Sequence, residues 1–166
     1  MRRPETYVGH PLEELDTPAL VLDLPAFERN VAALAAFFAG RPAALRPHSK
    51  THKCPQIALR QLAAGAIGIT CAKLSEAEVM AAAGVDDILV ANQVTGAVKV
   101  ERLAELAGRC HLMVAVDDAE NVDHLSRACA ARGVSLRVLV EVDVGMGRCG
   151  VAPGRPALEL ARRVAE

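Results

Sequence analysis

The segment Ile67-Gly-Ile-Thr-Cys-Ala-Lys-Leu-Ser-Glu-Ala-Glu-Val-Met-Ala-Ala-Ala-Gly84 contains one complete structural unit. Its first five residues are largely apolar and bounded by glycine and alanine, which is typical of a short buried strand. Ser75–Ala83 is rich in helix-forming residues, and the glycine that follows is a common helix terminator. Ser75 and Glu78 have the spacing of a capping box. The segment therefore predicts a strand followed by a helix, a βα unit.

The same unit recurs on both sides of this segment, at intervals of roughly 22–25 residues. Each predicted strand is a near-continuous apolar run, the pattern of a parallel sheet covered by helices. The repeat fits a (β/α)8 TIM-like barrel or a doubly wound α/β sheet and does not separate them. The predicted strands are 44–46, 67–71, 87–91, 111–116 and 136–142, and the helices are 55–64, 75–83, 97–107, 117–131 and 156–165.

The predicted organisation is an N-terminal lead-in over residues 1–24 and a partial barrel over residues 25–166. A complete barrel has eight units in about 250 residues, so five units predict the first part of a longer barrel. The lead-in holds a short apolar run, Ala19–Leu22, predicted as a strand. Leu24-Pro25 begins a helix, since proline suits a first helical turn. Its predicted buried stripe recurs at helical spacing: Phe27, Val31, Leu34 and Phe38.

Composition excludes several classes of protein. The chain has 166 residues, a net charge of −1 and four aromatic side chains, which disfavours a nucleic-acid surface. No apolar run approaches the ~18 residues of a membrane span, and the first residues lack the apolar core of a signal peptide. Five cysteines without a CxxC pair indicate reduced thiols. We therefore expect a cytoplasmic protein that binds neither nucleic acid nor membrane.

A cluster of cationic and titratable side chains follows the predicted strand 44–46, in Leu45-Arg-Pro-His-Ser-Lys-Thr-His-Lys-Cys-Pro55. Basic runs are usually solvated loops. Here the run lies between a predicted strand and a helix, which is where parallel α/β folds place active sites. A lysine crowded by other cations also loses its proton more readily, as Schiff-base chemistry requires. Chemistry is the preferred interpretation.

Further polar residues follow the other predicted strands: Lys73, Asn92, Gln93, Asp117, Asp143 and Arg148. The loop Gly145-Met-Gly-Arg-Cys-Gly150 fits either a phosphate-binding loop or a tight turn that needs positive φ. Arg148, between its glycines, favours an anion or phenolate contact. His48 and His52 have the spacing of metal ligands on a helix, but Pro47 makes an extended segment the better prediction. We therefore prefer acid–base or phosphate contacts over a metal.

Three motifs, in order along the chain, resemble one enzyme family. Arg46–Lys53, Cys71–Ala77 and Val140–Val151 are similar to the barrel of D-threonine aldolase, and Asp16–Leu24 agrees with it. The wider group includes D-serine dehydratase and 3-hydroxy-D-aspartate aldolase and is related to the N-terminal domain of alanine racemase. These are fold-type III pyridoxal-phosphate enzymes. The resemblance favours a barrel of the alanine racemase N-terminal type.

The resemblance also implies roles for individual residues. Lys50 is similar to the lysine that bonds to pyridoxal phosphate, and Arg148 to the arginine that contacts the cofactor's phenolic oxygen. We add His48 as a cofactor-binding residue. Lys53 is the second candidate lysine, but it lies where the next helix begins and is expected to point away.

The implied reaction is retro-aldol cleavage of a D-3-hydroxy amino acid to glycine and an aldehyde, assisted by a divalent metal. In the family the metal ligands belong to a C-terminal domain, and they are absent from this sequence. The alternatives are a D-serine dehydratase, a 3-hydroxy-D-aspartate aldolase or a non-catalytic pyridoxal-phosphate-binding protein. A homodimer is the family's expected assembly.

Overall fold

The computed structural model describes residues 7–166 and centres on one parallel sheet. Its strands lie in the order β1-β2-β3-β4, the order of the sequence, and every neighbouring pair is parallel. A doubly wound sheet reverses its strand order, whereas a barrel keeps it. The arrangement is therefore part of a barrel. The strands are β1 (Ile69–Cys71), β2 (Asp87–Val90), β3 (His111–Val116) and β4 (Arg137–Val140).

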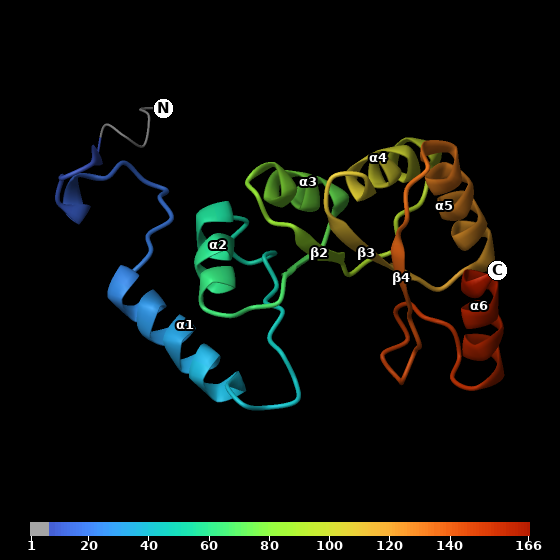
Figure 1. Ribbon diagram of the computed structural model, residues 1–166. Helices are drawn as coiled ribbons and strands as arrows, with labels where there is room; N and C mark the ends of the chain where they lie inside the picture. Colours follow the sequence, from blue (N-terminus) through green and yellow to red (C-terminus); the bar gives the residue numbers. More distant parts are fainter. Residues whose placement is uncertain (1–6) are drawn as a thin grey trace.

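Helices alternate with these strands, as the repeat predicted. In Figure 1, α3, α4 and α5 lie along one side of the sheet, α6 lies beside β4, and α1 and α2 lie at the other end. The N-cap Asp118 accepts a hydrogen bond from the backbone of Asn121 and so begins α5. The helices are α1 (Leu24–Phe38), α2 (Pro55–Ala63), α3 (Leu74–Ala82), α4 (Ala97–Ala107), α5 (Ala119–Arg132) and α6 (Arg155–Ala165), and a 3-10 turn spans Leu12–Glu14.

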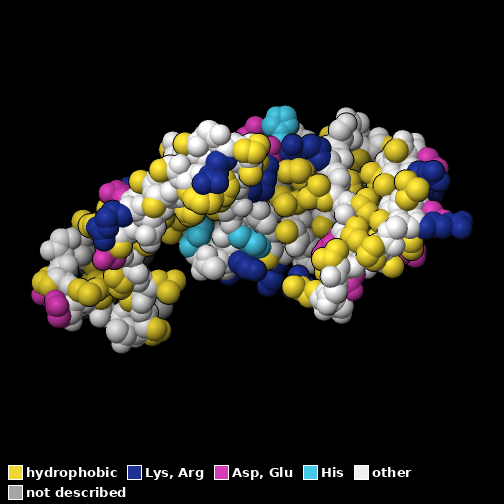
Figure 2. Space-filling view, turned by 90° about the horizontal axis from the view of Figure 1, so that it is seen from below, with side chains coloured by type: hydrophobic (Ala, Val, Ile, Leu, Met, Phe, Trp, Pro, Cys, Tyr) yellow, Lys and Arg dark blue, Asp and Glu magenta, His cyan; other side chains and the backbone are white. Residues whose placement is uncertain are grey.

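The core lies between the sheet and its helices. Ile69, Ile88 and Val114 are fully buried on the helix-covered face. The opposite face is partly open, since Leu139 is 45% exposed. Within residues 7–166, the helices therefore cover one face of the sheet. Figure 2, a view from below, shows hydrophobic side chains over much of that side, with His, Lys and Arg near its middle.

The N-terminal region departs from the sequence predictions. Ala19–Leu22 is not a strand, because no strand among the described residues lies beside it, and Leu20 is fully exposed. α1 begins as predicted, with Asp23 accepting a hydrogen bond from the backbone of Ala26 at 2.8 Å. Its apolar stripe is at most half-buried, since no residue of α1 is buried. Residues 1–6 of the predicted lead-in lie outside the described range.

The predicted strand 44–46 is displaced toward the C-terminus. Residues 45–49 run parallel to β1, with hydrogen bonds from Ile67 to Leu45 and from Thr70 to Pro47, and an isolated bridge joins His48 to Thr70. Pro47 has no N–H to donate, so the ladder is incomplete. This segment nevertheless fixes the start of the cationic cluster against the sheet.

Among residues 7–166, none of the helices combines the length and the apolar character needed to cross a bilayer.

Candidate functional site at the carboxyl edge of the sheet

A tight turn carries Lys50 past the end of the first parallel segment. Ser49 is fully buried and anchors this turn, because its N–H and its hydroxyl both donate to the Thr70 carbonyl, at 2.8 and 3.1 Å. The N–H groups of His52 and Lys53 both donate back to the Ser49 carbonyl, at 3.2 and 2.7 Å. The turn is therefore held to β1 at Ser49, while Lys50 remains exposed to solvent.

The two histidines flanking Lys50 share a local arrangement. His48 Nδ1 accepts the N–H of Lys50 at 3.2 Å, and His52 Nδ1 accepts the N–H of Cys54 at 3.0 Å. In the neutral ring, Nε2 then carries the proton. Burial lowers the pKa of both imidazoles, and the Lys50 charge lowers that of His48 further. His52 Nε2 is buried without a hydrogen-bond partner among the described residues.

Lys53 lies against the backbone of the Lys50 turn. Its Nζ donates to the backbone carbonyl of Lys50 at 2.6 Å and lies 3.9 Å from Glu76 Oε1. Glu76 is nearly buried, and its other oxygen accepts the N–H of Ala72 at 2.8 Å. The ammonium of Lys53 thus joins the turn to the start of α3.

Glu76 also corrects the predicted capping box. The N-cap of α3 is Lys73, so Glu76, not Glu78, occupies the third helical position and reaches back to the preceding backbone. Glu78 instead pairs with Arg102 of α4. Ser75 is exposed and lies inside the first turn of α3 instead of at its N-cap.

Arg46 does not belong to the Lys50 cluster. Its guanidinium contacts Asp87 Oδ1 at 2.8 Å, and Arg137 contacts Asp87 Oδ2 at 3.0 Å. Burial alone would raise the pKa of Asp87, but the hydrogen bonds from Arg137 and Arg46 hold it below its ordinary value. Asp87 and Arg137 begin their strands, so this network lies at the amino edge of the sheet. It is an ion-pair network separate from the Lys50 turn.

The glycine-rich loop after β4 satisfies its own backbone groups. The N–H groups of Gly145 and Gly147 donate to Asp143 Oδ1, at 2.9 and 3.0 Å, and the N–H of Gly150 donates to Asp117 Oδ2 at 2.8 Å. The amides of Gly147 and Gly145 lower the pKa of Asp143. A phosphate-binding loop would present such amides to its ligand. The structure therefore favours the tight-turn interpretation over the phosphate-binding one.

Arg148 is exposed on this loop. Beside it, the Cys149 thiol donates to Glu141 Oε1 at 2.9 Å, which raises the thiol's pKa. Gln93 donates to the other oxygen of Glu141 at 2.6 Å. Glu141 thus joins the ends of β2 and β4, a role that sequence reasoning missed. The sequence does contain a signal for this role, because Glu141 is a carboxylate within the largely apolar predicted strand 136–142.

The donor set at this edge fits a pyridoxal-phosphate cofactor. Lys50 supplies an accessible amine, and His52 supplies a buried N–H that lacks a partner within residues 7–166. Within residues 7–166, His, Cys, Asp and Glu side chains form no group of three or more that could hold a metal ion.

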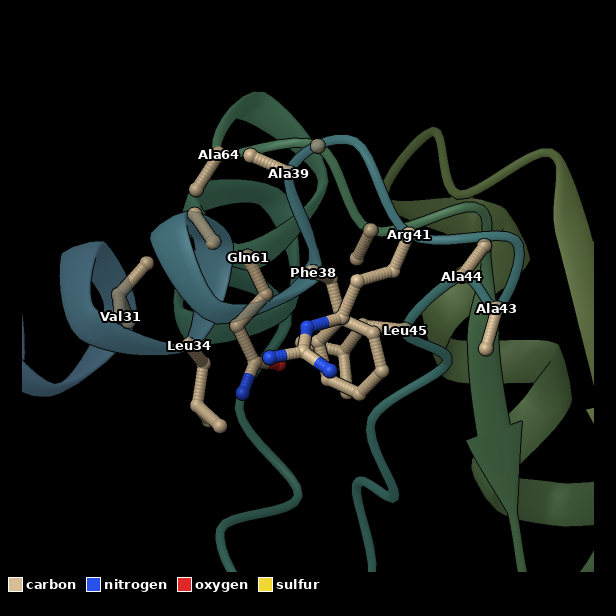
Figure 3. Close-up of a pocket in the computed structure, with 13 residues that line it drawn as sticks. Val31, Leu34, Phe38, Ala39, Arg41, Ala43, Ala44, Leu45, Gln61 and Ala64 are labelled. Carbon is tan, nitrogen blue, oxygen red and sulfur yellow. The ribbon is translucent and has the colours of Figure 1, made fainter.

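An apolar cavity of about 280 Å³ lies elsewhere, between α1 and α2. Figure 3 shows Phe38, Arg41 and Gln61 gathered at this cavity. Its loops, around residues 39–45 and 64–66, precede strands instead of following them. The cavity is therefore at the opposite end of the sheet from Lys50.

A parallel sheet in sequential order, with a lysine-bearing turn at its carboxyl edge, defines a (β/α) barrel with a site where such barrels place their chemistry. Residues 22–166 match the family described as "Alanine racemase, N-terminal domain". The chain belongs to this family.

The relatives agree with this assignment. The chain is 49% identical to a D-threonine aldolase of an Arthrobacter species over 160 residues, covering 96% of this chain and 42% of the relative. It is 38% identical over 154 residues to a 3-hydroxy-D-aspartate aldolase of Paracoccus denitrificans, and the match covers 92% of this chain and 40% of that relative. The crystal structure of D-threonine aldolase from Filomicrobium marinum superposes with a TM-score of 0.91 at 50% sequence identity. The match covers 93% of this chain and 42% of the crystallised chain. The chain thus spans about two fifths of these relatives' lengths.

Proposed function

We propose that this chain is the lysine-bearing part of a pyridoxal-phosphate-dependent lyase that cleaves D-3-hydroxy amino acids to glycine and an aldehyde. The observation that carries the proposal is the anchored turn that presents Lys50 at the carboxyl edge of a barrel sheet. Relatives named D-threonine aldolase and 3-hydroxy-D-aspartate aldolase support the substrate class.

Each residue has a distinct part in this proposal. Lys50 would bond covalently to the cofactor through its amine, and bound pyridoxal phosphate would supply an electron sink for charge developing at the substrate's Cα. His48 and His52 would present Nε2–H donors beside it. Arg148 would place a permanent positive charge and several donors at the same edge, which suits a phenolate or carboxylate oxygen.

The remaining expectations stay proposals. A divalent metal would polarise the substrate's 3-hydroxyl, held by residues other than those described. A homodimer and a cytoplasmic location are also proposed.

A dehydratase is the second candidate, because a relative named D-threo-3-hydroxyaspartate dehydratase from a Delftia species is 36% identical over 147 residues.

Product analysis separates these candidates. The protein that carries this sequence, loaded with pyridoxal phosphate and Mn²⁺, is incubated with D-threonine and, separately, with D-threo-3-hydroxyaspartate. An aldolase releases glycine with acetaldehyde or glyoxylate, whereas a dehydratase releases ammonia and a 2-oxo acid. Glycine formation that disappears in Lys50→Ala supports the proposal. Formation of ammonia without glycine would favour the dehydratase. If neither glycine nor ammonia formed, the result would contradict both candidate activities.

A further inference from the structure

Lys53 has a backbone conformation that needs an explanation. Its φ is +49°, and among residues 7–166 it is the one residue other than glycine with a positive φ. This left-handed region is unfavourable for a residue with a Cβ, and long side chains occupy it rarely. Such conformations persist where surrounding contacts enforce them, and they gather at functional sites.

Two contacts of the Lys53 ammonium accompany this conformation. Nζ donates to the carbonyl of Lys50 at 2.6 Å, three residues back, and it lies 3.9 Å from Glu76 Oε1. Its own N–H donates to the Ser49 carbonyl at 2.7 Å. Lys53 therefore closes the turn twice, through its backbone and through its side chain, with Lys50 inside the closed loop.

We propose that Lys53 is a positioning residue for Lys50, with Glu76 as its counter-ion. The ammonium fixes the peptide group of Lys50, so the exposed Lys50 side chain leaves a rigid backbone and reacts from a restricted set of directions. Glu76 extends this restraint to α3, because its other oxygen is held by the N–H of Ala72. The inference rests on the proposed function of Lys50 but concerns a different residue and a different kind of effect.

The chain suits a direct test, because it has four lysines: Lys50, Lys53, Lys73 and Lys99. Pyridoxal phosphate is added to the protein that carries this sequence, samples are reduced with borohydride over time, and each lysine's label is measured by peptide mapping. The variants are Lys53→Asn, which keeps a residue tolerant of positive φ but removes the ammonium, and Lys53→Arg, which keeps a cation. Glu76→Gln removes the counter-charge and keeps an acceptor for Ala72.

We expect pyridoxal phosphate to label Lys50 about tenfold more slowly in Lys53→Asn than in the original protein, which is the scale of one charge-assisted hydrogen bond. Lys73 and Lys99 should be labelled at their original rates. Lys53→Arg should restore most of the rate, and Glu76→Gln should slow it about threefold, as a weaker indirect contact would. Hydrogen exchange without cofactor should show faster exchange at residues 49–53 in Lys53→Asn and unchanged exchange in Lys53→Arg. Lys99→Ala, a surface variant, should match the original protein.

Three results would overturn the inference: wild-type labelling of Lys50 in Lys53→Asn, equal slowing at Lys50, Lys73 and Lys99, or a failure of Lys53→Arg to restore the rate. If Lys53→Asn does not fold, Glu76→Gln decides, and an unchanged Lys50 rate there counts against the proposal. Absence of Lys50 label in the original protein would contradict the proposed function itself, which keeps the two failures distinct.

Discussion

The Lys50 turn (residues 49–53) and the glycine-rich loop (residues 143–150) lie at the same edge of the sheet. They differ in the residues that adopt positive φ and in the groups that accept their backbone hydrogen bonds. The loop uses glycines at positive φ, and carboxylates of Asp143 and Asp117 accept its amides. The turn places a lysine at positive φ, leaves the Lys50 amine exposed and gives His52 Nε2 no partner among the residues that the structure describes. The loop thus satisfies these backbone amides internally and leaves only side chains such as Arg148 for a ligand, whereas the turn keeps donors that the proposed cofactor would use.

The largest stability effect should come from the glycine-rich loop, in Gly150→Ala. A Cβ there would lie 2.6 Å from the Asp143 nitrogen and 2.8 Å from the Val142 carbonyl carbon, at a φ of +99°. We expect a loss on the order of 3 kcal/mol, measured by urea denaturation. Gly147→Ala is the matched control, since it has positive φ but open space, and should cost only ~1 kcal/mol. Equal losses would show that the close approach does not matter.

The corresponding change in the turn is Ser49→Ala, with a smaller expected effect. It removes the buried hydroxyl that donates to Thr70, whose carbonyl keeps the Ser49 N–H as a donor. The expected cost is about 1 kcal/mol, again from urea denaturation, with Lys50 labelled more slowly. The exposed Ser75→Ala should stay within about 0.5 kcal/mol of the original protein. If Ser49→Ala left the free energy of unfolding unchanged, the Ser49 hydroxyl would not be an anchor of the turn.

Arg148→Ala should separate binding from stability. The side chain is exposed, so the free energy of unfolding should change by less than about 0.5 kcal/mol. The affinity for pyridoxal phosphate should fall by about tenfold if Arg148 contacts the cofactor, as measured by equilibrium dialysis. Unchanged affinity would contradict the assignment and make the whole loop structural.

The smallest effect concerns pH and Asp143→Asn. The amides of Gly147 and Gly145 lower the pKa of Asp143 in the folded protein. The carboxylate therefore stabilises the fold above its unfolded pKa of 3.8, and this contribution is lost as the pH falls through the lowered folded value. The stability difference between the original protein and Asp143→Asn should thus be present at pH 6 and vanish on acidification below 3.8. A difference independent of pH would contradict this.

Local signals predicted the barrel repeat well. α4 spans Ala97–Ala107 and β3 spans His111–Val116, as the sequence indicated, because both are set by continuous apolar or periodic patterns. The N-terminal run 19–22 was predicted as a strand from the same kind of signal, but a strand also needs a neighbour. The position of the Lys50 cluster between a parallel segment and α2 was likewise predictable.

Side-chain directions at the site were not predictable, because distant residues determine them. Arg46 turns to Asp87, 41 residues later, and so leaves the cluster. Lys53 turns back toward Lys50 and Glu76, and Glu76 takes the capping role expected of Glu78, which pairs with α4. The partners of Arg46 and Glu78 become neighbours only when the fold forms, and so does the Lys53–Glu76 pair, whereas the contact of Lys53 with the Lys50 carbonyl is local.

The most direct test of the central assignment is to identify the lysine that bonds to the cofactor. The protein that carries this sequence is saturated with pyridoxal phosphate, reduced with borohydride and digested, and its four lysines are compared by mass spectrometry. The account predicts stoichiometric label on Lys50 and none at that peptide in Lys50→Ala, with Lys53 unlabelled in both. Label on Lys53 in preference to Lys50, or an even distribution over all four lysines, would contradict it.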